Sequence, residues 1–274
     1  MLGRSSAHWL PILEVNLMSR VPRRAVLVAA GLAIALIVPT SVAANHSWGN
    51  YHWARTSNPF TLQLGDRLTD PWHSYLATTS SDWSVSSVLE TVIVPGTAVK
   101  RLCSATTGTV QVCNSKYGNN GWLGVAQIWI SGSHITKGTV KVNDTYFNTA
   151  TYNTPAWRNM VMCQEVGHTL GLDHQDETFG NENLGTCMDY TNDPSTNQHP
   201  NQHDLDQLEA IYAHLDSTTT VAAATVSTGR ADVPEVDASW GSLVAVSNGG
   251  HGATYLLDLD TDSAVVTYVL WANR

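Results

Sequence analysis

The residues that decide both fold and chemistry run from position 164 to position 174 and read QEVGHTLGLDH. In an α-helix, Gln164 and His168 lie one turn apart, so their side chains reach the same region of space. Gly171 can adopt a positive φ, which lets the chain turn sharply and brings His174 back toward that region. Two imidazoles and a carboxamide, with Glu165 beside them, form a donor set suited to zinc and a general base.

The segment before the turn is predicted to be helical. Thr154 and Pro155 form a typical helix start, and Gly171 stands where a C-terminal cap belongs, so we expect a helix over 156–170. Its inward face repeats at spacings of three and four residues and comprises Trp157, Met160, Val161, Gln164 and His168. The chemistry-bearing side chains therefore share a face with the core.

This pattern resembles the motif of the metzincin zinc metalloproteases, H-E-x-x-H-x-x-G-x-x-H followed by a Met-turn. The matching positions, at the family's spacing, are Glu165, His168, Gly171 and His174. Gln164 departs from the motif, because it stands where the family has its first histidine. The run Cys187-Met188-Asp189-Tyr190 lies where the Met-turn belongs. The resemblance is of the matrixin and astacin type and covers residues 51–216.

The resemblance implies an α/β fold, more narrowly of the α+β class. It would have a mixed twisted sheet, an active-site helix and a C-terminal helix. The last of these would be capped by Asn201 and run to about Leu215. The segment 121–130 resembles the family's edge strand, which pairs with extended substrate. After residue 217 we expect a low-complexity linker, and then three strands in a small C-terminal β appendage.

The resemblance also implies an activity, that of a zinc metalloendopeptidase that hydrolyses peptide bonds. Gln164, His168 and His174 would hold the metal. Glu165 would act as the general base on a zinc-activated water, and Tyr190 would donate to the developing oxyanion. Met188 would pack beneath the site and take no part in the chemistry.

Three interpretations of Gln164 stay open at this level. In the first, its amide oxygen is a working third ligand, with Tyr190 or water completing the coordination shell. In the second, another donor replaces it, and the candidates are Cys163, Asp173, His199 and His203. In the third, the site is degenerate and the chain is an extracellular protein-binding module. Glu165 argues against the third, because metal binding alone does not need that carboxylate.

The four cysteines are predicted to form two disulfides. Cys103 and Cys113 flank a Thr/Gly-rich segment, which favours a hairpin-like loop closed by its own disulfide over a zinc knuckle, whose paired spacing is missing. The resemblance implies that Cys163 and Cys187 pair, because the fold brings the active-site helix to the Met-turn.

Calcium is a second candidate ion. The oxygen-rich segments Asn143–Asp144 and 173–182 could hold it, although neither has EF-hand spacing, so a solvated loop is the favoured interpretation. The histidines outside the motif, among them His73, His134, His214 and His251, have no recognisable spacing and are expected to be solvated.

The N-terminus predicts export. Three arginines precede an uncharged run of 14 residues at 25–38, which ends near the small-residue site Val42-Ala43-Ala44. A membrane anchor is the alternative, but a spanning helix needs ~20 apolar residues. We therefore expect a signal peptide over 1–44, a protease domain over 45–216, a linker over 217–238 and the appendage over 239–274.

Charge limits the partners. The formal net charge of −9 leaves no basic surface for phosphates, which argues against nucleic acid and, after signal cleavage, against anionic membranes. The expected protein is secreted and extracellular, is a monomer, and acts on protein or peptide substrates.

Overall fold

The computed structural model describes residues 46–98, 101–221, 239–247 and 249–272. Its strands are β1 (His52–Trp53), β2 (Phe60–Arg67), β3 (Leu89–Pro95), β4 (Thr109–Ser115), β5 (Trp122–Ser131), β6 (His134–Asn143), β7 (Ser242–Val246), β8 (Gly252–Asp258) and β9 (Ser263–Trp271). The helices are α2 (Trp72–Trp83), α3 (Asp144–Phe147), α4 (Pro155–Thr169) and α5 (Gln202–Ile211).

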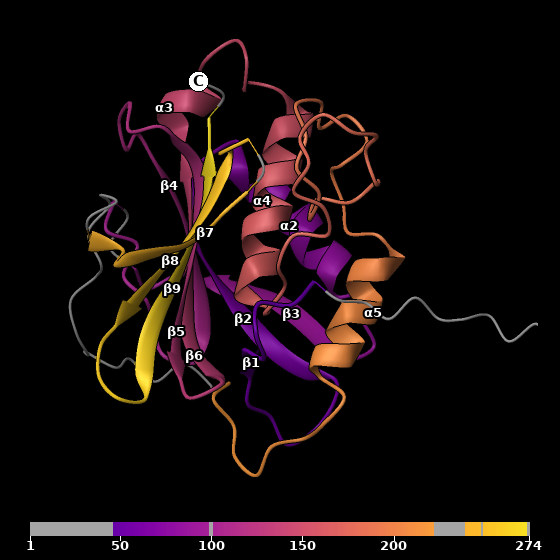
Figure 1. Cartoon of the computed structure of the whole chain (residues 1–274), viewed down its shortest axis with the longest axis vertical. Coiled ribbons are helices and arrows are strands. Elements are labelled where there is room, and N and C mark those ends of the chain that lie inside the picture. Colours follow the sequence, from indigo (N-terminus) through magenta and orange to yellow (C-terminus); the bar gives the residue numbers. More distant parts are fainter. Residues whose placement is uncertain (1–45, 99–100, 222–238, 248, 273–274) are drawn as a thin grey trace, which may run out of the picture. The chain divides into compact units, whose positions relative to one another are not determined.

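In the described part of the chain, the strands form one mixed sheet in the order β3-β2-β4-β6-β5-β9-β8-β7, with β1 alongside β6 (Figure 1). The pairs among β2, β3, β4 and β6 are parallel. From β5 through β9 and β8 to β7, the pairs are antiparallel. The predicted α+β class with a mixed sheet is confirmed.

Helix α4 packs against the sheet and carries the motif. Its N-cap is Thr154, whose side chain accepts a hydrogen bond from the backbone N–H of Trp157, and Pro155 occupies the first turn. The helix ends before Gly171, whose φ of +97° only glycine adopts without strain. These local signals account for a helix that lies within a residue of the predicted bounds.

Two apolar clusters use the two faces of β5. Leu123, Ile128 and Ile130 join the larger core beneath α2 and α4, whereas Trp122 and Trp129 join a smaller aromatic cluster with residues of β8 and β9. Because side chains alternate along a strand, β5 is buried on both faces. Such burial suits a strand inside a sheet.

The position of β5 corrects an expectation. It is not an edge strand, because β6 pairs with one side of it and β9 with the other. The strands expected as an appendage, β7, β8 and β9, continue the main sheet in the described residues. The parallel strand β4 also lies inside the sheet, where we expected a hairpin-like loop.

Both predicted disulfides are present, Cys103–Cys113 and Cys163–Cys187. The expected last helix is shorter than predicted, because α5 ends at Ile211. The predicted signal peptide and most of the predicted linker lie outside the described residues. Among the described residues, none of the helices has the length and apolarity that crossing a membrane requires.

Candidate active site

The side-chain oxygen of Gln164 is buried and accepts no hydrogen bond from the described residues. The residue is fully buried on α4, and its Nε2 donates to the carbonyl oxygen of Cys187 at 3.0 Å. That bond directs the amide so that Oε1 has no partner among the described residues. A buried acceptor left unpaired costs about 1–3 kcal/mol, so a bound cation would relieve a real deficit.

His168 lies one turn further along α4 and is also buried. Its Nδ1 lies 2.9 Å from the carbonyl oxygen of Leu172, an acceptor, so Nδ1 carries the ring proton and Nε2 keeps its lone pair. Burial, and then the neighbouring His174, lower the pKa of His168 to about 3. The ring is therefore neutral at pH 7, which is the form that binds metals.

His174 returns to the site after the turn at Gly171. Its ring centroid lies 4.5 Å from that of His168, in an edge-on arrangement. Burial lowers the pKa of His174, but the adjacent carboxylates of Asp173 and Glu177 raise it more, to about 9. These carboxylates lie 3.3 and 3.6 Å from Nδ1 and favour the protonated ring at pH 7, so a metal ion bound by His174 would have to displace a proton.

Glu165 is buried between α4 and β5. Neither of its carboxylate oxygens has a partner of good hydrogen-bond geometry among the described residues. Burial raises its pKa well above the usual range, and His174 and the Ala126 backbone offset this only in part. A Cβ on Gly124 of β5 would overlap the carboxylate, so any larger residue there would displace the Glu165 side chain.

The Met188 segment lies below the helix. A Cβ on Gly167 would meet Met188 Sδ at 2.6 Å, so the glycine permits close packing. The disulfide Cys163–Cys187 ties α4 to this segment. Tyr190, two residues after Met188, is buried with its ring 4.0 Å from that of His174. Burial raises the pKa of the Tyr190 hydroxyl well above its usual range.

The C-terminal strands cover the site. Tyr268 of β9 stacks flat on His168, with ring centroids 4.2 Å apart. Gly252 of β8 lies against the Tyr190 hydroxyl, leaving no room for a Cβ. Beside them, His251 stacks on Phe179 at 3.9 Å. These contacts, together with β9 pairing along β5, leave Glu165 and His168 only 1% exposed.

The structure gives each alternative ligand other contacts. Cys163 is in a disulfide, and Asp173 accepts from the backbone of its neighbour His174. His199 lies on the surface with Nδ1 2.7 Å from Asp82, and His203 stacks on His46. Asp173, however, forms with His174 and Glu177 a group whose potential ligand atoms lie within 4.8 Å of one another, so it stays an alternative ligand to Gln164.

Calcium finds no support in the described residues. Asn143 caps α3 and binds the backbone of Tyr117, while Asp144 accepts from Trp72 and Asn114. In the second segment, Asp176 accepts from Thr178 and Asn181. The oxygens of these residues therefore accept hydrogen bonds within the fold.

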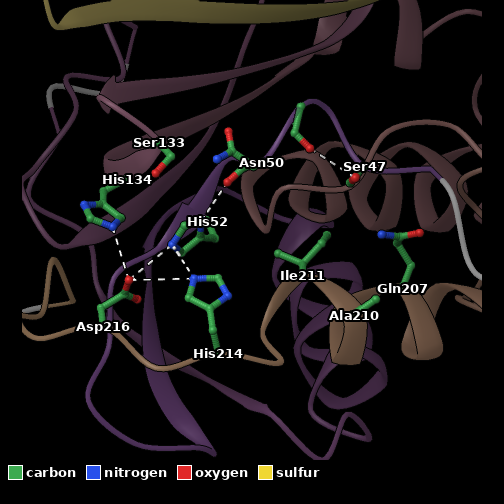
Figure 2. A pocket seen from close by; sticks show the side chains of 11 residues that line it. Ser47, Asn50, His52, Ser133, His134, Gln207, Ala210, Ile211, His214 and Asp216 are labelled. Carbon is green, nitrogen blue, oxygen red and sulfur yellow. Dashed lines mark hydrogen bonds and ion pairs between the residues drawn. The ribbon is translucent and has the colours of Figure 1, made fainter.

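The sequence did not predict a second group of polar side chains that the structure brings together. His52, His134, His214 and Asp216 line one cavity of about 500 Å³ (Figure 2). We expected His134 and His214 to be solvated, because residues from three separate segments leave no spacing to recognise. Only the pair His214-x-Asp216 was a local signal.

The donor set at α4 fits zinc. The rings of His168 and His174 lie together, Gln164 is one helical turn before His168, and zinc accepts both nitrogen and oxygen ligands. The structure buries Gln164, Glu165, His168, His174 and Tyr190, and it brings the rings of His168, His174 and Tyr190 together.

Comparisons with known proteins find similarity among solved structures and not among sequences. No family model matches the chain, and no curated protein matches it in sequence. Among solved structures, it is similar to High choriolytic enzyme 1 (HCE-1), a hatching enzyme zinc-protease from Oryzias latipes (Medaka fish). The identity is 8% and the TM-score 0.36, and the match covers 62% of this chain and 98% of that enzyme's chain.

Proposed function

We propose that the chain is a secreted zinc-dependent endopeptidase of metzincin type. One observation carries the proposal. Helix α4 buries the Gln164 amide oxygen and the Glu165 carboxylate without good hydrogen-bond partners among the described residues, and it brings His168 within 4.5 Å, ring centroid to ring centroid, of His174. A fold gains no stability from such an arrangement unless a cation completes it.

Gln164, His168 and His174 would be the metal ligands, and each is already oriented by the chain. The Cys187 carbonyl sets the amide of Gln164, and the Leu172 carbonyl sets the ring of His168. A zinc ion bound there lowers the pKa of a bound water to about 7 and polarises a carbonyl group.

Glu165 supplies the acid–base chemistry. Its raised pKa makes the carboxylate a stronger base than an exposed glutamate, so it can take a proton from the attacking water and pass it to the leaving amine. Tyr190 keeps its proton at neutral pH because its pKa is raised, and its hydroxyl can donate to the oxyanion of the substrate.

The described conformation corresponds to a closed form in this account. A peptide substrate would need the side of β5 on which β9 lies, and the site itself lies beneath Tyr268. Turnover therefore requires the C-terminal strands to move away from α4. This coverage equally suits the second candidate function, a protein-binding module that lacks catalysis.

The Glu165 carboxylate separates the two functions. It is buried and has no good partner, and its raised pKa suits a general base, which favours the enzymatic function over the binding module. Export agrees with the two disulfides. The proposed substrates are extracellular proteins or peptides, and the proposed active form is the monomer.

The test is hydrolysis of casein by the wild type and by a Tyr268→Ala variant, which uncovers His168. We expect hydrolysis that a chelator abolishes and zinc restores, and that is faster in the variant. If neither protein shows chelator-sensitive hydrolysis while zinc is bound, the enzymatic function is wrong and the binding module is favoured.

A further inference from the structure

A second cluster of potential ligands lies outside the site on α4. His52 is on β1, and its Cα pairs across the strands with that of His134 on β6. His214 and Asp216 follow α5, and their side chains point toward that of His52 (Figure 2). The Asp216 backbone N–H donates to the carbonyl of Arg55 at 2.9 Å, which holds this segment against the N-terminal strand.

Three ligand atoms of the cluster form a nearly equilateral triangle. His52 Nε2 lies 3.1 Å from His214 Nε2 and 3.5 Å from Asp216 Oδ1. The third side, from His214 Nε2 to Asp216 Oδ1, is 3.7 Å. Tetrahedral zinc with ligand distances of about 2.0–2.2 Å separates its ligands by about 3.3–3.6 Å, so an ion fits this triangle without rearrangement.

Hydrogen bonds around His52 direct a lone pair into the triangle. Its Nδ1 lies 2.6 Å from the carbonyl oxygen of Asn50, so Nδ1 holds the proton and Nε2 is an acceptor. That acceptor faces the carboxylate Oδ1, another acceptor, and both are largely buried. A proton on His214 Nε2 can be donated to only one of the two acceptors, His52 Nε2 or Asp216 Oδ1. A cation at the centre of the triangle would accept a lone pair from each of the three atoms.

Asp216 is held by groups that leave Oδ1 in place. Its Oδ2 accepts from Arg55 Nη1 at 2.8 Å and from the Arg55 backbone at 3.2 Å. His134 Nε2 lies 3.2 Å from Oδ1 on the β6 side. Such partners of a ligating carboxylate fix its orientation and raise metal affinity.

We propose that His52, His214 and Asp216 form a second metal site, which takes a zinc-type divalent transition ion. Two imidazoles and one carboxylate favour such ions over calcium or magnesium. These residues are one of the groups of potential ligands whose donor atoms all lie within 4.8 Å of one another in the described residues. The fourth position faces the cavity, since His214 is half-exposed.

The bound ion would act as a cross-link. It joins β1, near the start of the described chain, to the segment that leaves α5. The same two segments are also joined by a hydrogen bond, from the Thr220 backbone N–H to the Ala54 carbonyl at 2.9 Å. The site uses none of the residues of the proposed peptidase centre, so the two can be lost separately.

The experiment counts zinc in the purified full chain after dialysis against zinc, by elemental analysis. We expect two ions in the wild type and one in His214→Ala, which removes a half-exposed ligand and leaves the core intact. His168→Ala/His174→Ala should retain one ion, and adding His214→Ala to it should remove that ion. Thermal unfolding should show zinc-dependent stabilisation in the double variant but not in the triple one.

Matched controls remove surface histidines of similar surroundings. His73 and His199 each pair with an aspartate at 2.7 Å, and replacing either by Ala should leave the zinc count unchanged. The proposal is overturned if His214→Ala retains as much zinc as the wild type, or if His168→Ala/His174→Ala binds none. Failure of the peptidase centre alone gives one ion in the wild type, which only His214→Ala removes.

Discussion

At the scale of single residues, replacing Glu165 should have opposite effects on catalysis and on the free energy of unfolding. Under the proposed mechanism, Glu165→Gln should abolish casein hydrolysis while zinc binding stays, because the carboxylate would be the base and not a ligand. The same change should stabilise the metal-free protein at pH 7, because the amide cannot ionise and so avoids the cost of a buried carboxylate. Unchanged hydrolysis in this variant would rule out Glu165 as the base.

The gain in stability should depend on pH. Burial raises the pKa of Glu165 in the folded protein, so the folded state holds its proton to higher pH than the unfolded chain does. Stability of the metal-free wild type should therefore fall as pH rises above about 4.3, the unfolded value, and Glu165→Gln should lack this loss. Urea unfolding between pH 4 and 8 measures it, and a difference that shrinks with pH would contradict the account.

Gln164 is tested by its effect on zinc affinity. In a His214→Ala background, which leaves only the site on α4, Gln164→His should bind zinc at least about tenfold more tightly, because imidazole is the better donor. Gln164→Leu should bind more weakly. Gln111→Leu, a buried glutamine on β4, is the control. If competition with a chelator shows no shift for either change at 164, Gln164 is not a ligand.

At the scale of elements, the Cys163–Cys187 disulfide joins α4 to the Met188 segment and positions the Cys187 carbonyl that binds Gln164. Replacing both cysteines by alanine should cost about 2–4 kcal/mol of unfolding free energy and also weaken zinc binding. The Cys103–Cys113 disulfide closes a shorter loop, so replacing both of its cysteines by alanine should cost less unfolding free energy. This replacement should leave zinc affinity unchanged. Equal effects on zinc would contradict a positioning role.

Elements with local signals could be predicted, and elements with distant partners could not. Helix α4 has its cap, its proline and its terminal glycine in the sequence beside it, so its bounds were predicted. Strand β4 follows a Thr/Gly-rich segment with a disulfide, and only its pairing with β2 and β6 makes it a central strand. The residues of the motif come from one segment, whereas the cavity of Figure 2 draws on three.

At the scale of the whole molecule, β8 and β9 control access to the site. Tyr268→Ala removes the ring that stacks on His168, so it should raise the rate of casein hydrolysis and the rate at which a chelator removes zinc. Val266→Ala is the matched control, since it is a buried residue of the same strand and core cluster. Equal rates in both variants would mean that lost stability, and not an opened site, is responsible.

The long-range arrangement was the part that sequence did not predict. Residues of β9 read as a strand, but nothing local says that its partner is β5. We therefore expected a separate appendage and a free edge on β5, and the structure joins the two. The covering of His168 by Tyr268 follows from that pairing alone.

The central claim is that Gln164, His168 and His174 hold zinc. The most direct measurement is anomalous diffraction at the zinc absorption edge from crystals of the zinc-loaded full chain. The account predicts a peak within about 2.0–2.2 Å of Gln164 Oε1 and of one ring nitrogen from each histidine. A zinc-loaded crystal with no peak between these three side chains would contradict it.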